Sequence, residues 1–99
     1  MITFDPQSSH EQKGRRPALV LSKDLFNRST GLAFVCPITR TERGFPFHVP
    51  IPESSKLTGF IMVEQVKSVD FRSRRVKRIA HAGDQLLAEV LSILDACIY

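Results

Sequence analysis

The stretch PALVLSKDLFNRSTGLAFVCPI, residues 17–38, carries the strongest structural signal in this sequence. Its two apolar runs, 17–22 and 31–38, are short and bounded by proline, glycine and polar residues, as is typical of strands buried on both faces. The polar stretch 22–30 between them is long enough for one helical turn, with Ser22 placed as its N-cap. This stretch therefore predicts two buried strands joined by a short helical connection.

The chain that follows continues in short strands. Phe47, Val49 and Ile51 alternate with other residues, as the buried side chains of a half-buried strand do. The three prolines within 46–52 cannot donate to a β-ladder, so we expect this strand at an edge of the sheet. Further strand-like segments lie between residues 59 and 71.

One helix is predicted at the C-terminal end, over residues 84–98, entered by Gly83 and Asp84. Its apolar residues fall at helical spacing and form one stripe, made of Leu86, Leu87, Val90, Leu91, Leu94 and Ile98. Several short strands followed by a terminal helix predict a mainly β fold (α+β), a small antiparallel barrel with the helix covering one face.

Size and composition favour a single domain over residues 1–99, with fourteen Lys and Arg against ten Asp and Glu and a net charge of +4. The basic balance favours a polyanionic partner. Cys36 and Cys97 form no C-x-x-C pair, so neither a metal knuckle nor a disulfide framework is indicated. The sequence shows no secretion signal and no membrane span, and we expect a cytoplasmic protein that does not bind membranes.

Polar clusters flank the predicted strands. The loop SSHEQKGRRP, residues 8–17, gathers an imidazole, a carboxylate, an amide and three cations, although a solvated hairpin loop has the same composition. Arg16 stands out because Pro17 biases it to an extended conformation at the mouth of a buried strand. Thr39 ends the second apolar run, where threonine is commonly a turn or capping residue.

Two later segments are also candidates. EQVKS, 64–68, reads as strand, and a buried Glu64 would need a nearby cation such as an arginine of the first loop. RSRRVKR, 72–78, either tracks a phosphate backbone or forms a solvated turn. The histidines lack metal-ligand spacing, and the motifs of acyl transfer and nucleotide binding are absent. The residues alone thus permit chemistry on RNA without requiring it.

Six segments in this order closely resemble the MazF/PemK (Kid) family of toxin endoribonucleases: FDP, HEQKGRRPALVLS, CPIT, GFPFHV, VEQVKS and RRVKRI. The resemblance covers nearly the whole chain. It implies an SH3-like barrel of the MazF/PemK/CcdB type with a C-terminal helix. The family's first strand begins upstream of the point that ITFDP matches, so we expect a truncated first strand.

The resemblance also implies a function. It implies the homodimeric toxin of a type II toxin–antitoxin system, which cleaves single-stranded mRNA at specific sequences without metal or cofactor and so inhibits translation and growth. Its partner would be an antitoxin with an acidic, disordered tail, and it would reach operator DNA only through the antitoxin complex. Two alternatives stay open: a non-enzymatic CcdB-like toxin acting on a protein, and a catalytically dead homologue that binds RNA or antitoxin.

The family's catalytic residues map onto this chain by motif. In MazF-type members the arginine of the RP motif and the threonine of the P-x-T motif match Arg16 and Thr39. In PemK-type members the histidine of HEQ matches His10, while the R-x-D-Q segment reads MVEQ here, with Met62 and Glu64 in place of the acid and the base. Because Met62 cannot donate a proton, we favour the MazF-type assignment with Glu64 as a contributor.

The implied reaction is attack of the RNA 2′-hydroxyl on the adjacent phosphate, which gives a 2′,3′-cyclic phosphate and a 5′-hydroxyl. Arg16 suits the negative charge that develops, and Thr39 would hydrogen-bond the phosphate. His10 and Glu11 are the candidates to assist proton transfer. The predicted substrate-binding residues are Gln12, Lys13, Arg15, Arg40, Phe45, Phe47, Gln65, Lys67 and Ser68.

Overall fold

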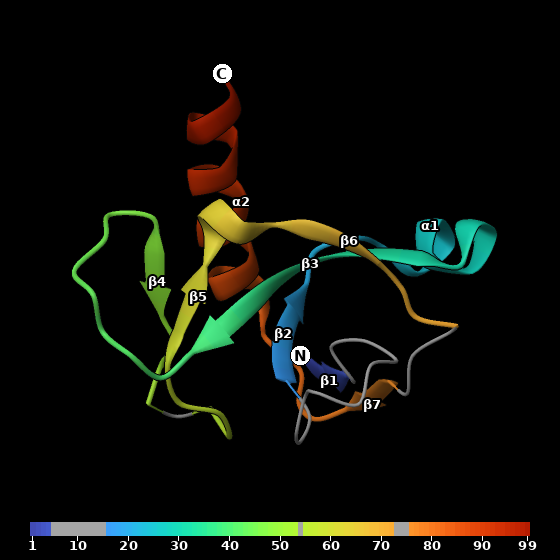
Figure 1. The fold of residues 1–99 in the computed structure, drawn as a ribbon, viewed down its shortest axis with the longest axis horizontal. Helices are drawn as coiled ribbons and strands as arrows, with labels where there is room; N and C mark the ends of the chain where they lie inside the picture. Colours follow the sequence, from blue (N-terminus) through green and yellow to red (C-terminus); the bar gives the residue numbers. More distant parts are fainter. Residues whose placement is uncertain (5–15, 54, 73–75) are drawn as a thin grey trace, which may run out of the picture.

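The computed structural model describes residues 1–4, 16–53, 55–72 and 76–99 (Figure 1). In chain order its elements are β1 (Ile2–Phe4), β2 (Arg16–Val20), α1 (Asp24–Thr30), β3 (Leu32–Thr39), β4 (His48–Pro50), β5 (Phe60–Met62), the 3-10 turn η1 (Val63–Gln65), β6 (Lys67–Asp70), β7 (Val76–Arg78) and α2 (Asp84–Ile98). The prediction of a mainly β fold with a C-terminal helix is confirmed.

All described strand pairs are antiparallel, and they run in the order β4-β5-β3-β2-β1-β7, with β6 paired to β3 off this path. The strand β3 organises the sheet, because it pairs with β2 on one side and with both β6 and β5 on the other. Among the described residues no pairing joins β4 to β7. The expected barrel is therefore an open antiparallel sheet in these ranges.

The two central strands bury side chains on both faces, as predicted. Leu19 and Cys36 lie opposite each other in β2 and β3 and belong to the cluster that also contains Leu86 and Val90 of α2. Their neighbours on the other face join a second cluster, formed by Ile2, Ala18, Ala33, Val35 and Val69. Since successive side chains of a strand point to opposite faces, continuous apolar runs are what this position requires.

The capping prediction for the first helix is wrong. Lys23 is the N-cap of α1, and no side chain caps the helix start. The Ser22 hydroxyl instead donates to Oδ1 of Asn27 at 2.5 Å and accepts a hydrogen bond from the backbone N–H of Phe34 at 3.0 Å. Ser22 thus connects α1 to β3 through these two hydrogen bonds, in place of the predicted capping of the helix start.

The edge-strand prediction for residues 46–52 is confirmed, since β4 ends the strand order. Val49 and Ile51 are buried, whereas Phe47 is 42 % exposed because it precedes the strand. In α2 the predicted stripe is partly wrong, because Leu91 is 42 % and Ile98 63 % exposed. The C-terminal turn of α2 extends beyond the sheet (Figure 1), which leaves Ile98 uncovered, whereas Leu91 is turned by about 100° around the helix axis from the buried Val90.

Two further segments differ from expectation. The stretch that was expected to form one strand over EQVKS contains the turn η1 followed by β6. The basic stretch 72–78 includes β7, which pairs with β1, so its last three residues belong to the sheet rather than to a turn. Within the ranges that the structure describes, no helix is long and apolar enough to cross a membrane.

Candidate functional site

Arg16 and Thr39 lie at the same end of two adjacent central strands, β2 and β3. Arg16 is the first residue of β2 and Thr39 the last residue of β3. The pairing of the two strands runs from Val20 opposite Val35 to Ala18 opposite Pro37, so Arg16 and Thr39 each lie two residues beyond its last pair, at the same end of the two strands. Arg16 is exposed and Thr39 half-buried.

The backbone at Thr39 is held from two sides. On the far side from β2, Thr39 pairs with Phe60 of β5, while its hydroxyl accepts a hydrogen bond from the backbone N–H of Thr41 at 3.2 Å. Gly59 approaches so closely that a Cβ at that position would lie 2.5 Å from the carbonyl oxygen of Thr39. The positive φ of Gly59, 134°, also favours glycine. The end of β3 is thus fixed in place.

A hollow of about 280 Å³ opens beside Thr39, at the end of the molecule that carries β4 and β5 (Figure 1). Its lining comes from the end of β3, the segment 40–47, β4, β5 and η1, and consists of Thr39, Arg43, Phe45, His48, Met62, Glu64 and Gln65. Four of these residues were predicted from the sequence as site residues, namely Thr39, Phe45, Glu64 and Gln65. Arg43, His48 and Met62 were not.

The turn η1 explains why Glu64 and Gln65 face outward. Val63 between β5 and these residues is fully buried, and its backbone N–H donates to the carbonyl oxygen of Phe47 at 3.1 Å. The backbone N–H of Val66 closes the turn on the carbonyl oxygen of Val63. With Val63 anchored in the core, the next two side chains point toward the surface.

Glu64 pairs with a histidine, not with the expected arginine. The Nε2 atom of His48 lies 3.0 Å from Oε2 of Glu64. The His48 side chain is only 3 % exposed and that of Glu64 31 % exposed. The sequence prediction assumed a buried Glu64, and the structure shows it partly exposed, with a neighbouring strand supplying its partner. The sequence feature that could have indicated this partner is His48 itself, a polar residue that follows Phe47 and precedes Val49 in the predicted edge strand.

The buried thiol of Cys36 lies close enough to Glu64 for the charge of that carboxylate to affect its pKa. Burial raises the pKa of Cys36 to about 11, and the negative charge of Glu64 adds to the increase. Because the thiol is the form present below that pH, Cys36 is neutral at physiological pH and does not act as a nucleophile.

We therefore expect the two cysteines to differ in reactivity. In the folded chain at pH 8, iodoacetamide should modify the exposed Cys97 and leave the buried Cys36 unmodified, as read by peptide mass spectrometry. Raising the pH through about 11 should increase the thiolate of Cys36. In guanidinium both cysteines should react alike. Equal modification of both cysteines in the folded chain would contradict the assignment.

The remaining predicted residues divide into three groups. Arg40 and Phe47 are exposed in or next to the segment that borders the hollow. Lys67 and Ser68 lie in β6 and pair with Val35 and Phe34, and neither lines the hollow. The last group lies outside the described residues and consists of His10, Glu11, Gln12, Lys13 and Arg15.

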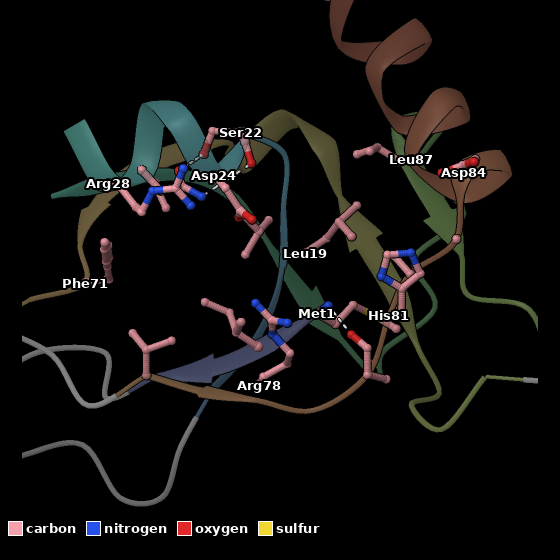
Figure 2. Close-up of a pocket in the computed structure, with 18 residues that line it drawn as sticks. Met1, Leu19, Ser22, Asp24, Arg28, Phe71, Arg78, His81, Asp84 and Leu87 are labelled. Carbon is pink, nitrogen blue, oxygen red and sulfur yellow. Dashed lines mark hydrogen bonds between the residues drawn. The ribbon is translucent and has the colours of Figure 1, made fainter. Parts of the chain in front are cut away.

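A second, larger hollow of about 690 Å³ lies between α1, β1 and the segment that enters α2 (Figure 2). Figure 2 shows Asp24 and Arg28 on one side of it and Met1, Arg78 and His81 on the other. The ammonium group of Met1 donates to the carbonyl oxygen of Ala80 at 2.5 Å, and burial, then the charge of Arg78, lowers its pKa. Among the described residues, no predicted site residue lines this hollow. In the described ranges, no three His, Cys, Asp or Glu residues group as metal ligands.

Two known proteins are similar to this chain over almost its whole length. The chain is 41 % identical over 103 residues to the endoribonuclease toxin ChpB of Escherichia coli strain K12, covering 99 % of this chain and 88 % of that protein. It is 38 % identical over 96 residues to the endoribonuclease toxin MazF of the same strain, covering 94 % of this chain and 86 % of that protein.

Solved structures of MazF proteins have a fold similar to that of this chain. A crystal structure of MazF from Deinococcus radiodurans superposes with a TM-score of 0.84 at 40 % identity, over 98 % of this chain and 91 % of that chain. A MazE–MazF structure from the same organism gives a TM-score of 0.88 at 36 % identity, over 98 % and 88 %. The sequence profile of one family matches residues 1–98. The chain belongs to the family of PemK-like, MazF-like toxins of type II toxin–antitoxin systems.

Proposed function

We propose that this chain is the toxin of a type II toxin–antitoxin pair. It cleaves single-stranded RNA at the end of the sheet where strand β2 begins and strand β3 ends. The observation that carries the proposal is the hollow that Thr39 shares with Glu64, at the end of β3 that lies beside the start of β2 with Arg16. The endoribonuclease names of its relatives support the same reaction.

In this reaction the RNA supplies its own nucleophile. The 2′-hydroxyl loses its proton to Glu64 and its oxygen bonds to the adjacent phosphorus, while the bond from phosphorus to the 5′ oxygen breaks. The leaving 5′ oxygen takes a second proton from His10, assisted by Glu11, so the products are a 2′,3′-cyclic phosphate and a 5′-hydroxyl, with Glu64 left protonated and His10 deprotonated. A substrate that lacks the 2′-hydroxyl is not cleaved.

Arg16 and Thr39 act on the phosphate. The guanidinium of Arg16 is permanently charged and its planar fork fits two phosphate oxygens, so it stabilises the extra negative charge at phosphorus. The hydroxyl of Thr39 donates to the same group. Held on two adjacent strands, these groups need little rearrangement when the charge develops, which is the condition for electrostatic catalysis.

The hollow and its surroundings bind the flanking nucleotides. Arg40 and Arg43 border it with positive charge, and Phe45 offers an exposed aromatic face, the kind of surface on which unpaired bases stack. Gln12, Lys13, Arg15, Phe47 and Gln65 extend this surface in the proposal. Lys67 and Ser68 of β6 serve a more distant part of the RNA.

We also propose a cognate antitoxin as partner, since relatives of similar fold have been solved as MazE–MazF complexes. The net charge of +4 suits an acidic, disordered antitoxin segment that covers the RNA-binding surface. In this proposal the toxin is a cytoplasmic homodimer and contacts operator DNA only through the antitoxin.

The proposed reaction is tested with the purified chain and a long single-stranded RNA in the presence of EDTA. We expect cleavage at a limited set of sequences, with 2′,3′-cyclic phosphate and 5′-hydroxyl ends identified by end mapping. The matched control is the same sequence with a single 2′-deoxynucleotide at each cleavage site, which should stay intact. Absence of cleavage, or cleavage of the deoxy control, would contradict the proposal.

A further inference from the structure

His48 carries an unusual buried atom. In the described part of the chain, its Nδ1 is the one buried side-chain nitrogen or oxygen without a hydrogen-bond partner. A buried polar atom left unpaired costs free energy, and a side chain of similar shape without that atom would avoid the cost. The other ring nitrogen, Nε2, faces Glu64 at 3.0 Å. The contact with Glu64 is therefore what distinguishes His48 from an apolar residue at this position.

The surroundings fix the imidazole in one orientation. His48 begins β4 and pairs with Met62, the last residue of β5. The ring of Phe45 packs against its edge, with ring centroids 5.1 Å apart at 60°. Both residues line the hollow, but the side chain of His48 is only 3 % exposed against 31 % for Glu64, so Glu64 is the member of the pair that is more accessible to a substrate.

The position of the ring proton follows from this geometry. A proton on Nδ1 would be a buried donor without an acceptor, while a proton on Nε2 is donated directly to the Glu64 carboxylate. The histidine thus presents a donor to one carboxylate oxygen. Fixing that oxygen orients the whole carboxylate relative to Thr39, which lines the same hollow.

We propose that His48 is a positioning residue: its Nε2–H holds Glu64 in the orientation in which the carboxylate accepts the proton of the RNA 2′-hydroxyl. This inference rests on the proposed function and adds a residue to that site. His48 gains and loses no proton in the step, because the 2′-hydroxyl proton passes to Glu64 itself. A partner that orients a functional side chain without touching the substrate typically changes activity by about 10- to 100-fold.

The test compares three substitutions at one position. Gln places an amide N–H near the location of Nε2, Asn carries the same amide but ends one bond short, and Phe fills the ring volume without a donor. We expect His48→Phe and His48→Asn to lower kcat for RNA cleavage by about 10- to 100-fold with KM changed less than about twofold. His48→Gln should recover most of the loss. The melting temperature of His48→Phe should equal or exceed that of the parent, because the unpaired atom is gone.

A double-mutant cycle with Glu64→Gln gives the second measurement. If His48 acts through Glu64, adding His48→Phe to Glu64→Gln should produce little further loss. Parental kcat in His48→Phe or in Glu64→Gln, or independent losses that multiply in the double variant, would overturn the inference. Should His48→Phe not fold, the comparison of Gln with Asn decides in the same way. A parent chain that leaves RNA uncut overturns the proposed function instead.

Discussion

Replacing Arg16 with alanine is expected to slow RNA cleavage by about 10³-fold or more and to leave the melting temperature close to that of the parent. Arg16 is exposed at the first position of β2, so the truncation opens no cavity in either apolar cluster. The truncation removes the positive charge that the proposed reaction places at the phosphate. Since that charge acts mainly on the transition state, the loss should appear in kcat more than in KM.

Two matched variants give this prediction its specificity. Arg16→Lys keeps the charge but not the planar fork, and it should recover only part of the activity. Arg28→Ala removes an arginine from the exposed surface of α1, at the other end of the molecule, and lowers the net charge by the same amount. Equal losses in Arg16→Ala and Arg28→Ala would mean that overall charge, not the position of Arg16, supports cleavage.

The central fold could be read from the sequence because burial dictates it residue by residue. Leu19 and Cys36 had to be apolar on one face and Ala18 and Val35 on the other, which produces continuous apolar runs. The apolar stripe of α2 predicted the burial of only some of its residues. Periodicity shows which residues of α2 share a face, but not how far the sheet extends beneath them, and so Ile98 was wrongly expected to be covered.

The candidate site was also predicted only in part from the sequence. Arg16 and Thr39 are predicted from motifs, and the antiparallel pairing of β2 and β3 brings the ends of the two strands that carry them to the same side. His48 and Glu64 are 16 residues apart, on β4 and η1, and their contact depends on which residue of β4 meets the end of β5. A shift of one residue would turn His48 away from Glu64. No local pattern specifies that register, which is why the sequence left the partner of Glu64 open.

Replacing Thr39 with valine is expected to reduce cleavage by about 10²- to 10³-fold. Valine keeps the branched shape at the end of β3 and its pairing with Phe60, but it removes the hydroxyl that would donate to the phosphate. The hydroxyl also accepts the hydrogen bond from Thr41, so the variant loses one exposed local contact as well. Thr39→Ser retains both hydrogen bonds and should recover much of the activity, which would show that the hydroxyl and not the methyl group of Thr39 is required.

The combination of Thr39→Val with Arg16→Ala then reports whether the two residues act on one phosphate. Groups that stabilise the same charge at the same moment are not additive, so the double variant should lose less than the product of the two single losses. Single-turnover rates on one RNA, measured below saturation, give the comparison directly. Losses that multiply fully would assign the two side chains to separate steps, for example Thr39 to holding the RNA and Arg16 to the charge at phosphorus, and would contradict the shared phosphate site.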